Sequence, residues 1–479
     1  MYCGYITTIK NLRPHPNADR LDLGECFGNT VCVGRWEYAE GDVILYFPTD
    51  GQLSEEFCAQ HDLVRRKDEN GNPAGGYLEP GKRNIRAINL RGSKSDGLVM
   101  PLSCLEYTGV DIATLTVGTP ITVVNGREIC CKYVPRTNVR GDHSRGGNKT
   151  RKHKDPISPL FQEHADTEQL AYNLAAFKPG DEIEITLKMH GTSQRTAHLP
   201  VLTGYKRTFW DKIFKRPGEP IYDWGSVSGT RRVVLDSYDG GFYGSNEFRE
   251  QHSKTFEGKL WKGETVYMEV VGFTHTGAPI MASADNKKIN DKEFAKQYGK
   301  ETVFSYGCSP DGLGEVVDYW DAECTQPAIY KKVPQSDIYV YRMTMTNEDG
   351  NVVEYTPDFM RYRCEQMGVK TVPVLWKGTI PEVTEHIVGR DADNNIVYAE
   401  QCSAGEWIKD IAEQYYDGPD PVGKTHVREG VVVRIVNRPK FCAYKHKNHS
   451  FKIISGIAIE QAENNGTADA ISEDILAEM

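Results

Sequence analysis

Short runs that alternate apolar and polar residues recur along the chain and are interrupted by Gly, Asp and Pro. Before residue 130 the clearest examples are NTVCVGRW, DVILYFP, IRAINLRG and DGLVMPL. A period of two places successive side chains on opposite faces of a strand, and the frequent turn residues keep each strand short. The first 130 residues are therefore predicted to form a small antiparallel β-barrel.

A second set of strands is predicted after residue 175, now accompanied by helices. The runs DEIEITLKMHG, TVYMEVVGFT, SDIYVYRMT, REGVVVRIV and FCAYKHK are typical of strands, whereas PDFMRYRCEQMG and AGEWIKDIAEQYY are typical of helices. This combination predicts an α+β domain over residues 176–460 with a mainly antiparallel sheet.

A basic segment separates the two predicted domains. Between Lys132 and Lys154 the chain carries eight Lys or Arg residues and one Asp, with a Gly-Gly pair and little apolar periodicity. We therefore expect residues 131–175 to be a flexible linker, either a solvated tether or a mobile arm that binds phosphates. Residues 461–479 carry five carboxylates and no Lys or Arg, so a frayed acidic tail with one short helix around DAISEDILAEM is expected.

Composition excludes several classes of protein. A net charge of −10 is unlike that of proteins that coat nucleic acid indiscriminately. The chain lacks a run of about 18 apolar residues, so no membrane span is expected. Its N-terminus lacks the features of a secretory signal, which predicts a cytoplasmic protein. The twelve cysteines form no CxxC pair, so reduced, structural cysteines are expected.

Lys188 is the first candidate for chemistry. In IEITLKMHG, Ile183, Ile185 and Leu187 are expected on one strand face and Glu184, Thr186 and Lys188 on the other. Gly191 would then allow the close approach of a phosphate. Taken alone, a lysine at such a position is an ordinary surface residue.

Four later strands strengthen the case for a site. In chain order they place Glu269 within VYMEVVG, aromatic residues including Tyr341 within IYVYRM, Glu429 at the start of REGVVVR, and Lys445 and Lys447 on one face of YKHK. Buried carboxylates and paired lysines are costly unless they meet a ligand or one another. A structural ion pair among these groups, or a purely packing role for Tyr341, is the alternative.

These motifs resemble those of the covalent nucleotidyltransferase superfamily of ATP-dependent ligases and RNA capping enzymes. The superfamily pattern is KxDG or KxHG, a strand Glu, a strand aromatic, an EG strand and a KxK strand. Here it is matched by Lys188-Met-His190-Gly191, Glu269, Tyr341, Glu429-Gly430 and Lys445-His-Lys447. The histidine and the following Gly-Thr-Ser are closest to the RNA-ligase-2-like branch.

The N-terminal region also resembles part of that branch. PHPNADRL and the strands after it are similar to the N-terminal oligonucleotide-binding (OB) barrel of Deinococcus-type RNA ligases. A DNA ligase of the superfamily would add a C-terminal barrel, for which the 32 residues after Lys447 are too few. The resemblance thus implies an OB-like β-barrel over residues 1–130 followed by an antiparallel-sheet nucleotidyltransferase domain. Residues 345–425 form a longer segment than the resemblance leads us to expect.

The resemblance also implies roles for individual residues. Lys188 would form lysyl-AMP from ATP, and His190 would act on the phosphates or on the leaving pyrophosphate. Glu429 would bind or position Mg²⁺ or Mn²⁺, with Glu269 on the ribose and Tyr341 stacked on adenine. Lys445 and Lys447 would contact phosphates. An arginine would contact the nucleotide or RNA end; Arg207 and Arg231 are both candidates, and Arg231 is favoured because its Gly-Thr-Arg turn precedes a strand.

One position departs from the family pattern. Many relatives have Glu immediately before the lysine, but this chain has Leu187, which leaves only a backbone carbonyl to contact adenine from that position.

The implied reaction sets a chemical requirement. Attack on phosphorus needs an uncharged amine, whereas the pKa of an ordinary lysine is about 10.4, so the site is expected to lower the pKa of Lys188 by desolvation and by nearby cations.

The expected substrate is a pair of RNA ends, in a nicked duplex or with mixed RNA and DNA strands, bound by a monomeric enzyme. The alternatives are a DNA ligase, a GTP-using capping enzyme, and a non-catalytic RNA-binding protein of the same fold.

Overall fold

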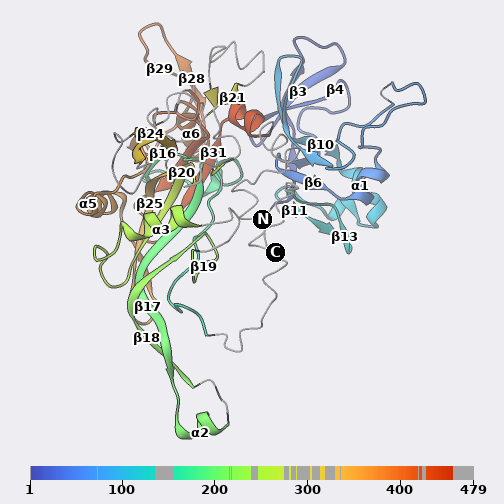
Figure 1. Cartoon of the computed structure of the whole chain (residues 1–479). Coiled ribbons are helices and arrows are strands. Elements are labelled where there is room, and N and C mark those ends of the chain that lie inside the picture. The colour runs from blue at the N-terminus through green and yellow to red at the C-terminus, as the bar shows by residue number, and fades with distance from the viewer. Residues whose placement is uncertain are drawn as a thin grey trace. The chain divides into compact units, whose positions relative to one another are not determined.

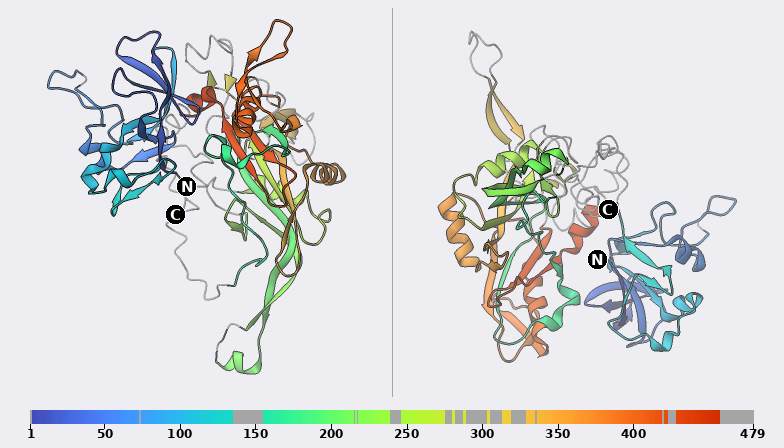
Figure 2. Two further views of the ribbon diagram at one scale, coloured as in Figure 1. Left: turned by 180° about the vertical axis from the view of Figure 1, so that it is seen from behind. Right: turned by 90° about the horizontal axis from the view of Figure 1, so that it is seen from below.

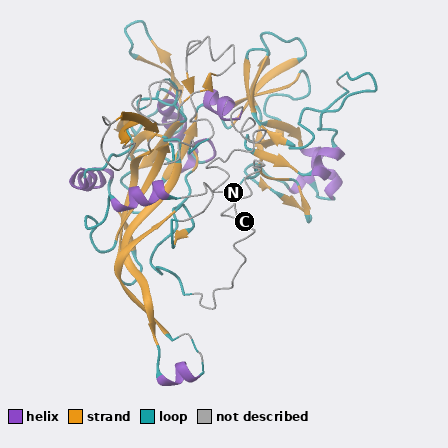
Figure 3. Cartoon of the chain, viewed as in Figure 1, coloured by secondary structure: helices purple, strands orange, loops and turns teal. Residues whose placement is uncertain are grey.

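The computed structural model describes residues 2–72, 74–134, 155–214, 216, 218–238, 246–274, 280–281, 336–418, 420–422 and 428–456, together with the backbone of four short strands between residues 287 and 334. The acidic tail and most of the basic linker segment lie outside this set. Figure 1 shows the chain, and Figure 3 shows that strands predominate over helices. The described chain is thus α+β and rich in strands, as predicted.

The chain divides into two compact units, each described by itself. Unit 1 comprises Met1–Pro135 and His449–Ile457, and unit 2 comprises Arg136–Asn448 and Ala458–Met479. The sequence analysis predicted one continuous domain over residues 176–460. The placement of residues 449–456 with the N-terminal unit was not predicted, because a short helix after a strand does not reveal which surface it packs against.

Unit 1 consists of several small antiparallel sheets. Among its described residues these sheets do not join into one closed sheet. The four-stranded sheet has the order β10 (Leu98–Pro101), β5 (Val43–Phe47), β1 (Gly4–Thr8) and β11 (Pro120–Ile121). The three-stranded sheets are β2 (Lys10–Pro14), β3 (Leu21–Cys26) and β4 (Asn29–Gly34), and β14 (Cys130–Lys132), β6 (Gly51–Leu53) and β7 (Asn84–Ile85). The two-stranded sheets are β8 (Ala87–Leu90) with β9 (Ser93–Asp96), and β12 (Val123–Val124) with β13 (Arg127–Glu128).

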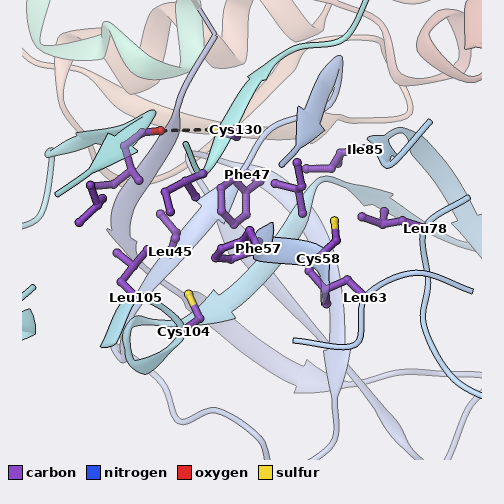
Figure 4. Packing of buried hydrophobic residues seen from close by; sticks show 14 of the residues in the cluster. Leu45, Phe47, Phe57, Cys58, Leu63, Leu78, Ile85, Cys104, Leu105 and Cys130 are labelled. Atoms are coloured by element: carbon purple, nitrogen blue, oxygen red, sulfur yellow. Dashed lines mark hydrogen bonds between the residues drawn. The ribbon is translucent and has the colours of Figure 1, made fainter. Parts of the chain in front are cut away.

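The core of unit 1 is formed by the inward faces of these strands and a short helix. Helices α1 (Glu55–Gln60), η1 (Leu102–Thr108) and η2 (Ile112–Thr114) complete the N-terminal part of the unit. Phe47 and Phe57 pack edge to face with ring centroids 5.6 Å apart, and Leu45 and Leu105 are fully buried beside them (Figure 4). The thiol of Cys130 donates a hydrogen bond to the carbonyl of Ile121 at 3.2 Å, which links two of the small sheets.

Unit 2 contains two larger sheets. The five-stranded sheet has the order β15 (Glu168–Gln169), β31 (Ala443–Lys447), β30 (Gly430–Ile435), β16 (Glu182–Leu187) and β27 (Val374–Thr379). The six-stranded sheet has the order β19 (Val234–Leu235), β18 (Glu219–Gly229), β17 (Thr192–Lys206), β20 (Glu264–Gly272), β25 (Ser336–Thr346) and β26 (Val352–Glu354). Among the named strands, all described pairings are antiparallel except that of β15 with β31. The remaining strand pairs are β21 (Lys287–Lys288) with β22 (Val303–Phe304), β23 (Leu313–Asp318) with β24 (Ile329–Pro334), and β28 (Glu385–Arg390) with β29 (Ile396–Gln401).

The helices of unit 2 follow local sequence signals. Helix α5 (Pro357–Met367) begins after Thr356, whose hydroxyl accepts from the Phe359 amide, and ends at Gly368 with a φ of 71°. Helix α6 (Ala404–Glu413) begins with a capping box between Ser403 and Glu406. Both helices were predicted from the sequence. The other helical segments are α2 (Phe209–Ile213), α3 (Glu247–Lys254), η4 (Leu170–Tyr172) and η5 (Leu174–Ala176).

Part of the predicted linker is structured. Phe161 and Leu170 are buried in unit 2, and β15 pairs with β31, so residues 155–175 do not behave as the flexible tether that was predicted for 131–175. The basic character that suggested a tether ends at Lys154. The predicted linker was wrong to include residues 155–175, because apolar residues of this segment are buried in unit 2.

Candidate nucleotide-binding site

The site forms where the chain passes from one sheet of unit 2 to the other. Strand β16 ends at Leu187 in the five-stranded sheet, and β17 begins at Thr192 in the six-stranded sheet. Residues 188–191 therefore connect the two sheets. The Lys188 amide donates to the carbonyl of Gly430 at 3.0 Å, which fixes the start of this connection against β30.

The alternation predicted for β16 is present. Ile183 and Ile185 are buried on the core face, and Glu184, Thr186 and Lys188 line a pocket on the other face. Leu187, at the end of the strand, is buried and also lines the pocket. The pocket has a volume of about 800 Å³, including its opening to solvent.

Lys188 and Glu429 form the central ion pair of the site. The ammonium Nζ of Lys188 lies 2.8 Å from Oε1 of Glu429, and Nζ of Lys447 lies 3.5 Å from the same oxygen. On the other side, Nδ1 of His190 donates to Oε2 of Glu429 at 2.8 Å. Glu429 is only 3 % exposed, so one buried carboxylate joins motifs that are more than 230 residues apart in the chain.

The electrostatics of Glu429 follow from this geometry. Burial alone would raise the pKa of Glu429, but the charges of Lys188, His190 and Lys447 outweigh burial and lower the pKa well below its ordinary value. The carboxylate is therefore ionised throughout the neutral range. If Lys188 is the nucleophile that the sequence predicts, its ion pair with Glu429 would have to be broken to give an uncharged amine.

Two glycines permit this close arrangement. A Cβ on Gly191 would lie 2.1 Å from the carbonyl oxygen of Val270, and a Cβ on Gly430 would lie 2.1 Å from that of His446. Gly430 also has a φ of 144°, which disfavours any other residue. Both glycines of the sequence motifs are thus required by backbone contacts between neighbouring segments.

Glu269 and Tyr341 lie on neighbouring strands at the pocket. Oγ of Ser193 is 3.5 Å both from Oε2 of Glu269 and from the hydroxyl of Tyr341. Burial, and secondarily the charge of Glu269, raise the pKa of Tyr341, so its hydroxyl stays protonated. The two groups offer the pocket a carboxylate acceptor and an aromatic face.

The pocket brings together some of the predicted residues and leaves others at its edge or far away. Leu187, Lys188, Arg231, Glu269 and Tyr341 line it. His190, Glu429 and Lys447 join it through the ion-pair cluster. Lys445 lies beside Val432 in the pairing of β31 with β30, on the same strand face as Lys447.

The two candidate arginines are well separated. Arg231 follows β18, and its guanidinium donates to Oδ1 of Asp166 at 2.8 Å. Arg207 follows the other end of the long β17 and does not line the pocket. Of the two candidates, only Arg231 is among the residues that line the pocket.

Sequence reasoning missed His164. This residue comes from the segment predicted to be linker, and its ring lies 5.2 Å, centroid to centroid, from both Tyr267 and Tyr341. Burial, followed by the charge of Arg342, lowers the pKa of His164 well below its ordinary value, so the ring is neutral. Its Nδ1 accepts a hydrogen bond from Arg342 at 3.3 Å.

Phe441 and Arg434 were also missed. The guanidinium carbon atoms of Arg342 and Arg434 lie 4.6 and 5.2 Å from the ring centroid of Phe441. No local motif marks these residues, although the alternation in GVVVRI placed Arg434 on the face opposite Val433 and Ile435.

Comparisons with known proteins address the fold. No protein-family model matches the chain, and no curated protein sequence matches it. Solved structures of Naegleria gruberi RNA ligase do match. A variant of that ligase with AMP and manganese gives a TM-score of 0.52 at 14 % identity, covering 94 % of this chain and 98 % of the other. The structure with pyrophosphate gives the same values, and another variant with ATP and manganese gives a TM-score of 0.51 at 14 % identity, covering 95 % and 98 %.

The chain shares the fold of an RNA ligase. The similarity extends over nearly the full length of both chains. Among the described residues, no helix has both the length and the apolar composition needed to cross a membrane.

Proposed function

We propose that this protein is an ATP-dependent RNA ligase that joins 3′-hydroxyl and 5′-phosphate ends through lysyl-AMP and adenylylated-RNA intermediates. The observation that carries the proposal is the cluster of Lys188, His190, Glu429 and Lys447 beside a pocket that Glu269 and Tyr341 also line. A reactive amine, surrounding cations, an acceptor for ribose and an aromatic face are the groups that lysine adenylylation requires.

In the first step, the nitrogen of Lys188 attacks the α-phosphorus of ATP. A nitrogen–phosphorus bond forms, the bond from the α-phosphorus to the oxygen bridging the β-phosphate breaks, and pyrophosphate leaves. Lys447 lies 3.5 Å from Glu429, the carboxylate that also contacts Lys188. We therefore assign its ammonium to stabilise the negative charge that develops on the phosphates near Lys188. We assign Lys445 and His190 to the same phosphates.

In the pocket, Tyr341 is assigned to stack on adenine and Glu269 to accept hydrogen bonds from the ribose hydroxyls. Arg231 is assigned to the nucleotide or the RNA end. Leu187 cannot offer a side-chain hydrogen bond because it is apolar and buried, so that position contributes only its backbone.

A divalent ion, Mg²⁺ or Mn²⁺, fits the donor set. The described residues contain no group of three or more His, Cys, Asp or Glu side chains that could hold a metal. Mg²⁺ in nucleotide sites is usually held by one or two carboxylates together with substrate phosphates and water, and Glu429 can supply such a carboxylate. When bound, the ion would neutralise phosphate charge. Glu429 would then exchange its contact with Lys188 for one with the ion.

The later steps regenerate the amine. An oxygen of the RNA 5′-phosphate attacks the phosphorus of lysyl-AMP, which breaks the nitrogen–phosphorus bond and transfers AMP to the RNA. The 3′-hydroxyl then attacks the 5′-phosphate, forms the phosphodiester and releases AMP. We assign these steps to residues 176–460, acting in a monomer on ends such as those of a nicked duplex. The N-terminal strands are proposed to form an OB-like element that grips the RNA.

Incubation with radiolabelled nucleotide tests the proposal. ATP labelled at the α-phosphate should leave label on the protein after denaturing electrophoresis, and GTP should not. Mass spectrometry should locate an AMP adduct on Lys188, and Lys188→Ala should lose the adduct while still binding RNA. Label from GTP alone would support a capping-type enzyme, and no label from either nucleotide would support a non-catalytic RNA-binding protein.

A sealing assay then identifies the polynucleotide. Nicked duplexes with RNA or DNA on each side of the nick should be sealed when RNA supplies the 3′-hydroxyl end. Sealing of all-DNA nicks with equal efficiency would favour the DNA-ligase alternative.

A further inference from the structure

A long β-hairpin in unit 2 is not accounted for by the proposed chemistry. Strand β17 starts directly after Gly191 and runs for 15 residues, and β18 returns beside it over 11 residues. The hairpin extends beyond the rest of its sheet and ends at helix α2 (Figure 1; Figure 2, left). At about 3.3 Å per residue, β17 spans about 45 Å from the catalytic segment to the tip.

The tip exposes a group of large apolar side chains. Phe209, Trp210, Ile213 and Phe214 are 71, 62, 52 and 60 % exposed. The rings of Trp210 and Phe214 are stacked, with centroids 5.9 Å apart and an interplanar angle of 18°. Phe209 meets Trp210 edge to face at 5.9 Å. Exposed aromatic clusters of this kind usually mark a binding surface.

The helix that presents these rings is locally well formed. Thr208 and Asp211 make a capping box, in which the Asp211 side chain accepts from the backbone and hydroxyl of Thr208. These hydrogen bonds lower the pKa of Asp211, so its carboxylate is ionised and accepts hydrogen bonds from Thr208 at the start of the helix. The aromatic side chains are therefore exposed by a capped helix rather than by an irregular loop.

Cations surround the aromatic group. Residues 206–219 contain five Lys or Arg and two Asp or Glu, although the whole chain has a net charge of −10. The guanidinium of Arg216 lies 5.5 Å from the ring centroid of Phe214. Lys206, Arg207 and Lys212 belong to the same tip. A local positive charge on an acidic protein is complementary to a polyanion.

We propose that this hairpin tip, defined by residues 206–214 and Arg216, binds an unpaired RNA strand that extends from the ends being joined. Aromatic rings can stack on exposed bases of any sequence, and interspersed cations can contact the backbone phosphates. A protein partner would use the apolar side chains but would leave the concentration of cations unexplained. The inference rests on the proposed function, which identifies the polyanion as RNA. The tip would add a second RNA contact about 45 Å along β17 from Lys188.

The distance sets a length requirement for the RNA. A strand of five nucleotides is about 17 Å long when stacked at roughly 3.4 Å per nucleotide, which is too short to reach from Lys188 to the tip. A strand of 30 nucleotides is about 100 Å long by the same measure and can reach both. Only the longer strand can therefore gain affinity by contacting the pocket and the tip together.

The test measures RNA binding and self-adenylylation for matched variants. Fluorescence anisotropy with labelled 30-nucleotide and 5-nucleotide RNAs is compared for the wild type, Trp210→Ala/Phe214→Ala, the conservative Trp210→Phe/Phe214→Tyr, and Lys206→Ala/Lys212→Ala. Tyr398→Ala serves as the control, since Tyr398 is 49 % exposed on the separate hairpin of β28 and β29. AMP adduct formation from ATP without RNA is measured for each protein.

Each variant has its own expected effect on RNA affinity and on adduct formation. The double alanine variant should bind the 30-nucleotide RNA about tenfold more weakly, whereas the aromatic replacement and Tyr398→Ala should bind it as the wild type does. For the double lysine variant, the plot of log binding constant against log salt concentration should become shallower by about 1.4, which corresponds to the loss of two phosphate contacts on a single strand. Adduct formation should be unchanged in all of them.

Two results would overturn the proposal. One is unchanged affinity of both double alanine variants for the 30-nucleotide RNA. The other is an equal loss for the 5-nucleotide RNA, which is too short to contact the pocket and the tip together and would show that the tip binds RNA by itself and not as a second contact. A change in sedimentation behaviour on removing the aromatic rings, with RNA affinity unchanged, would assign the tip to protein contacts instead. Absence of the AMP adduct in the wild type would contradict the proposed function but not the binding result, because anisotropy needs no catalysis.

Discussion

The ammonium of Lys188 lies 2.8 Å from Oε1 of Glu429, which is the same oxygen that Lys447 approaches at 3.5 Å. One carboxylate thus holds both the proposed nucleophile and a proposed phosphate-binding cation. This geometry makes Glu429 a residue whose removal should affect both stability and reaction.

The substitution Glu429→Gln tests that dual role. Removing the charge leaves Lys188 and Lys447 close together without their shared anion, so we expect unit 2 to lose up to about 3 kcal/mol of stability, limited by the partial solvent access of both lysines. AMP adduct formation should fall at least tenfold. Urea denaturation and adduct mass spectrometry measure the two effects.

The stability loss should also depend on pH. The pKa of Glu429 is lower in the folded protein than in the unfolded chain, where it is about 4.3. Its stabilising contribution is therefore complete above that value and lost as the pH falls through the lower, folded pKa. The wild type and Glu429→Gln should converge in stability in acid, and a constant difference from pH 7 to pH 3 would contradict this account.

The motif glycines can be tested by adding a single methyl group. Gly191→Ala would place Cβ 2.1 Å from the Val270 carbonyl oxygen, and Gly430→Ala would place Cβ 2.1 Å from that of His446 at a φ of 144°. Each substitution should destabilise unit 2 by about 2 kcal/mol or more. Gly204→Ala is the control, because its Cβ meets nothing within 4 Å. Similar urea midpoints for all three variants would show that the backbone contacts are not restrictive.

Arg231 and Arg207 give a third comparison. Arg231 lines the pocket, whereas Arg207 lies at the hairpin tip. Arg231→Ala should reduce AMP adduct formation at limiting ATP by about tenfold, consistent with the loss of one charged contact of about 1.4 kcal/mol. Arg207→Ala should form the adduct normally. Reversal of this order would show that the nucleotide is bound elsewhere.

Much of the fold of unit 2 could be predicted from local patterns. Strands such as β16 and β30 have a clear alternation or a continuous apolar run, and the caps at Thr356 and Ser403 mark α5 and α6. The pairing partners could not be derived this way, because an apolar strand face does not specify which strand lies beside it. The order of the motifs supplied that information only through the family resemblance.

The site shows the same division. Lys188, Glu269, Tyr341 and Glu429 stand out because charged or aromatic residues occupy positions within or directly beside apolar strands, where they need a partner. His164 and Phe441 have no such pattern. They reach the pocket through tertiary packing of segments that carry no recognisable motif. The apolar residues of SPLFQEHA and LAYNLA were the signal that residues 155–175 are structured.

A fourth prediction concerns the helix at 449–456, which directly follows β31 and belongs to unit 1. Its His449 lies with Nδ1 2.5 Å from Oδ1 of Asp96, and Nζ of Lys452 lies 2.9 Å from Oδ2. Burial alone would raise the pKa of Asp96, but Lys452 and His449 lower it to about 2. The unfolded value is about 3.9, so the stabilisation is complete above pH 4 and is lost as the pH falls toward 2.

The substitution Asp96→Asn should therefore destabilise unit 1 by about 3 kcal/mol near neutral pH, since it leaves the ammonium of Lys452 without its carboxylate partner beside a buried amide. The difference from the wild type should shrink between pH 4 and pH 2. Lys452→Ala should remove part of the same pH dependence, whereas Lys82→Ala, on another ion pair of unit 1, should not. Hydrogen exchange of amides in residues 449–456 provides the local measurement: faster exchange in Asp96→Asn is expected, because the helix is anchored by this carboxylate, and unchanged exchange would show that apolar packing alone holds it.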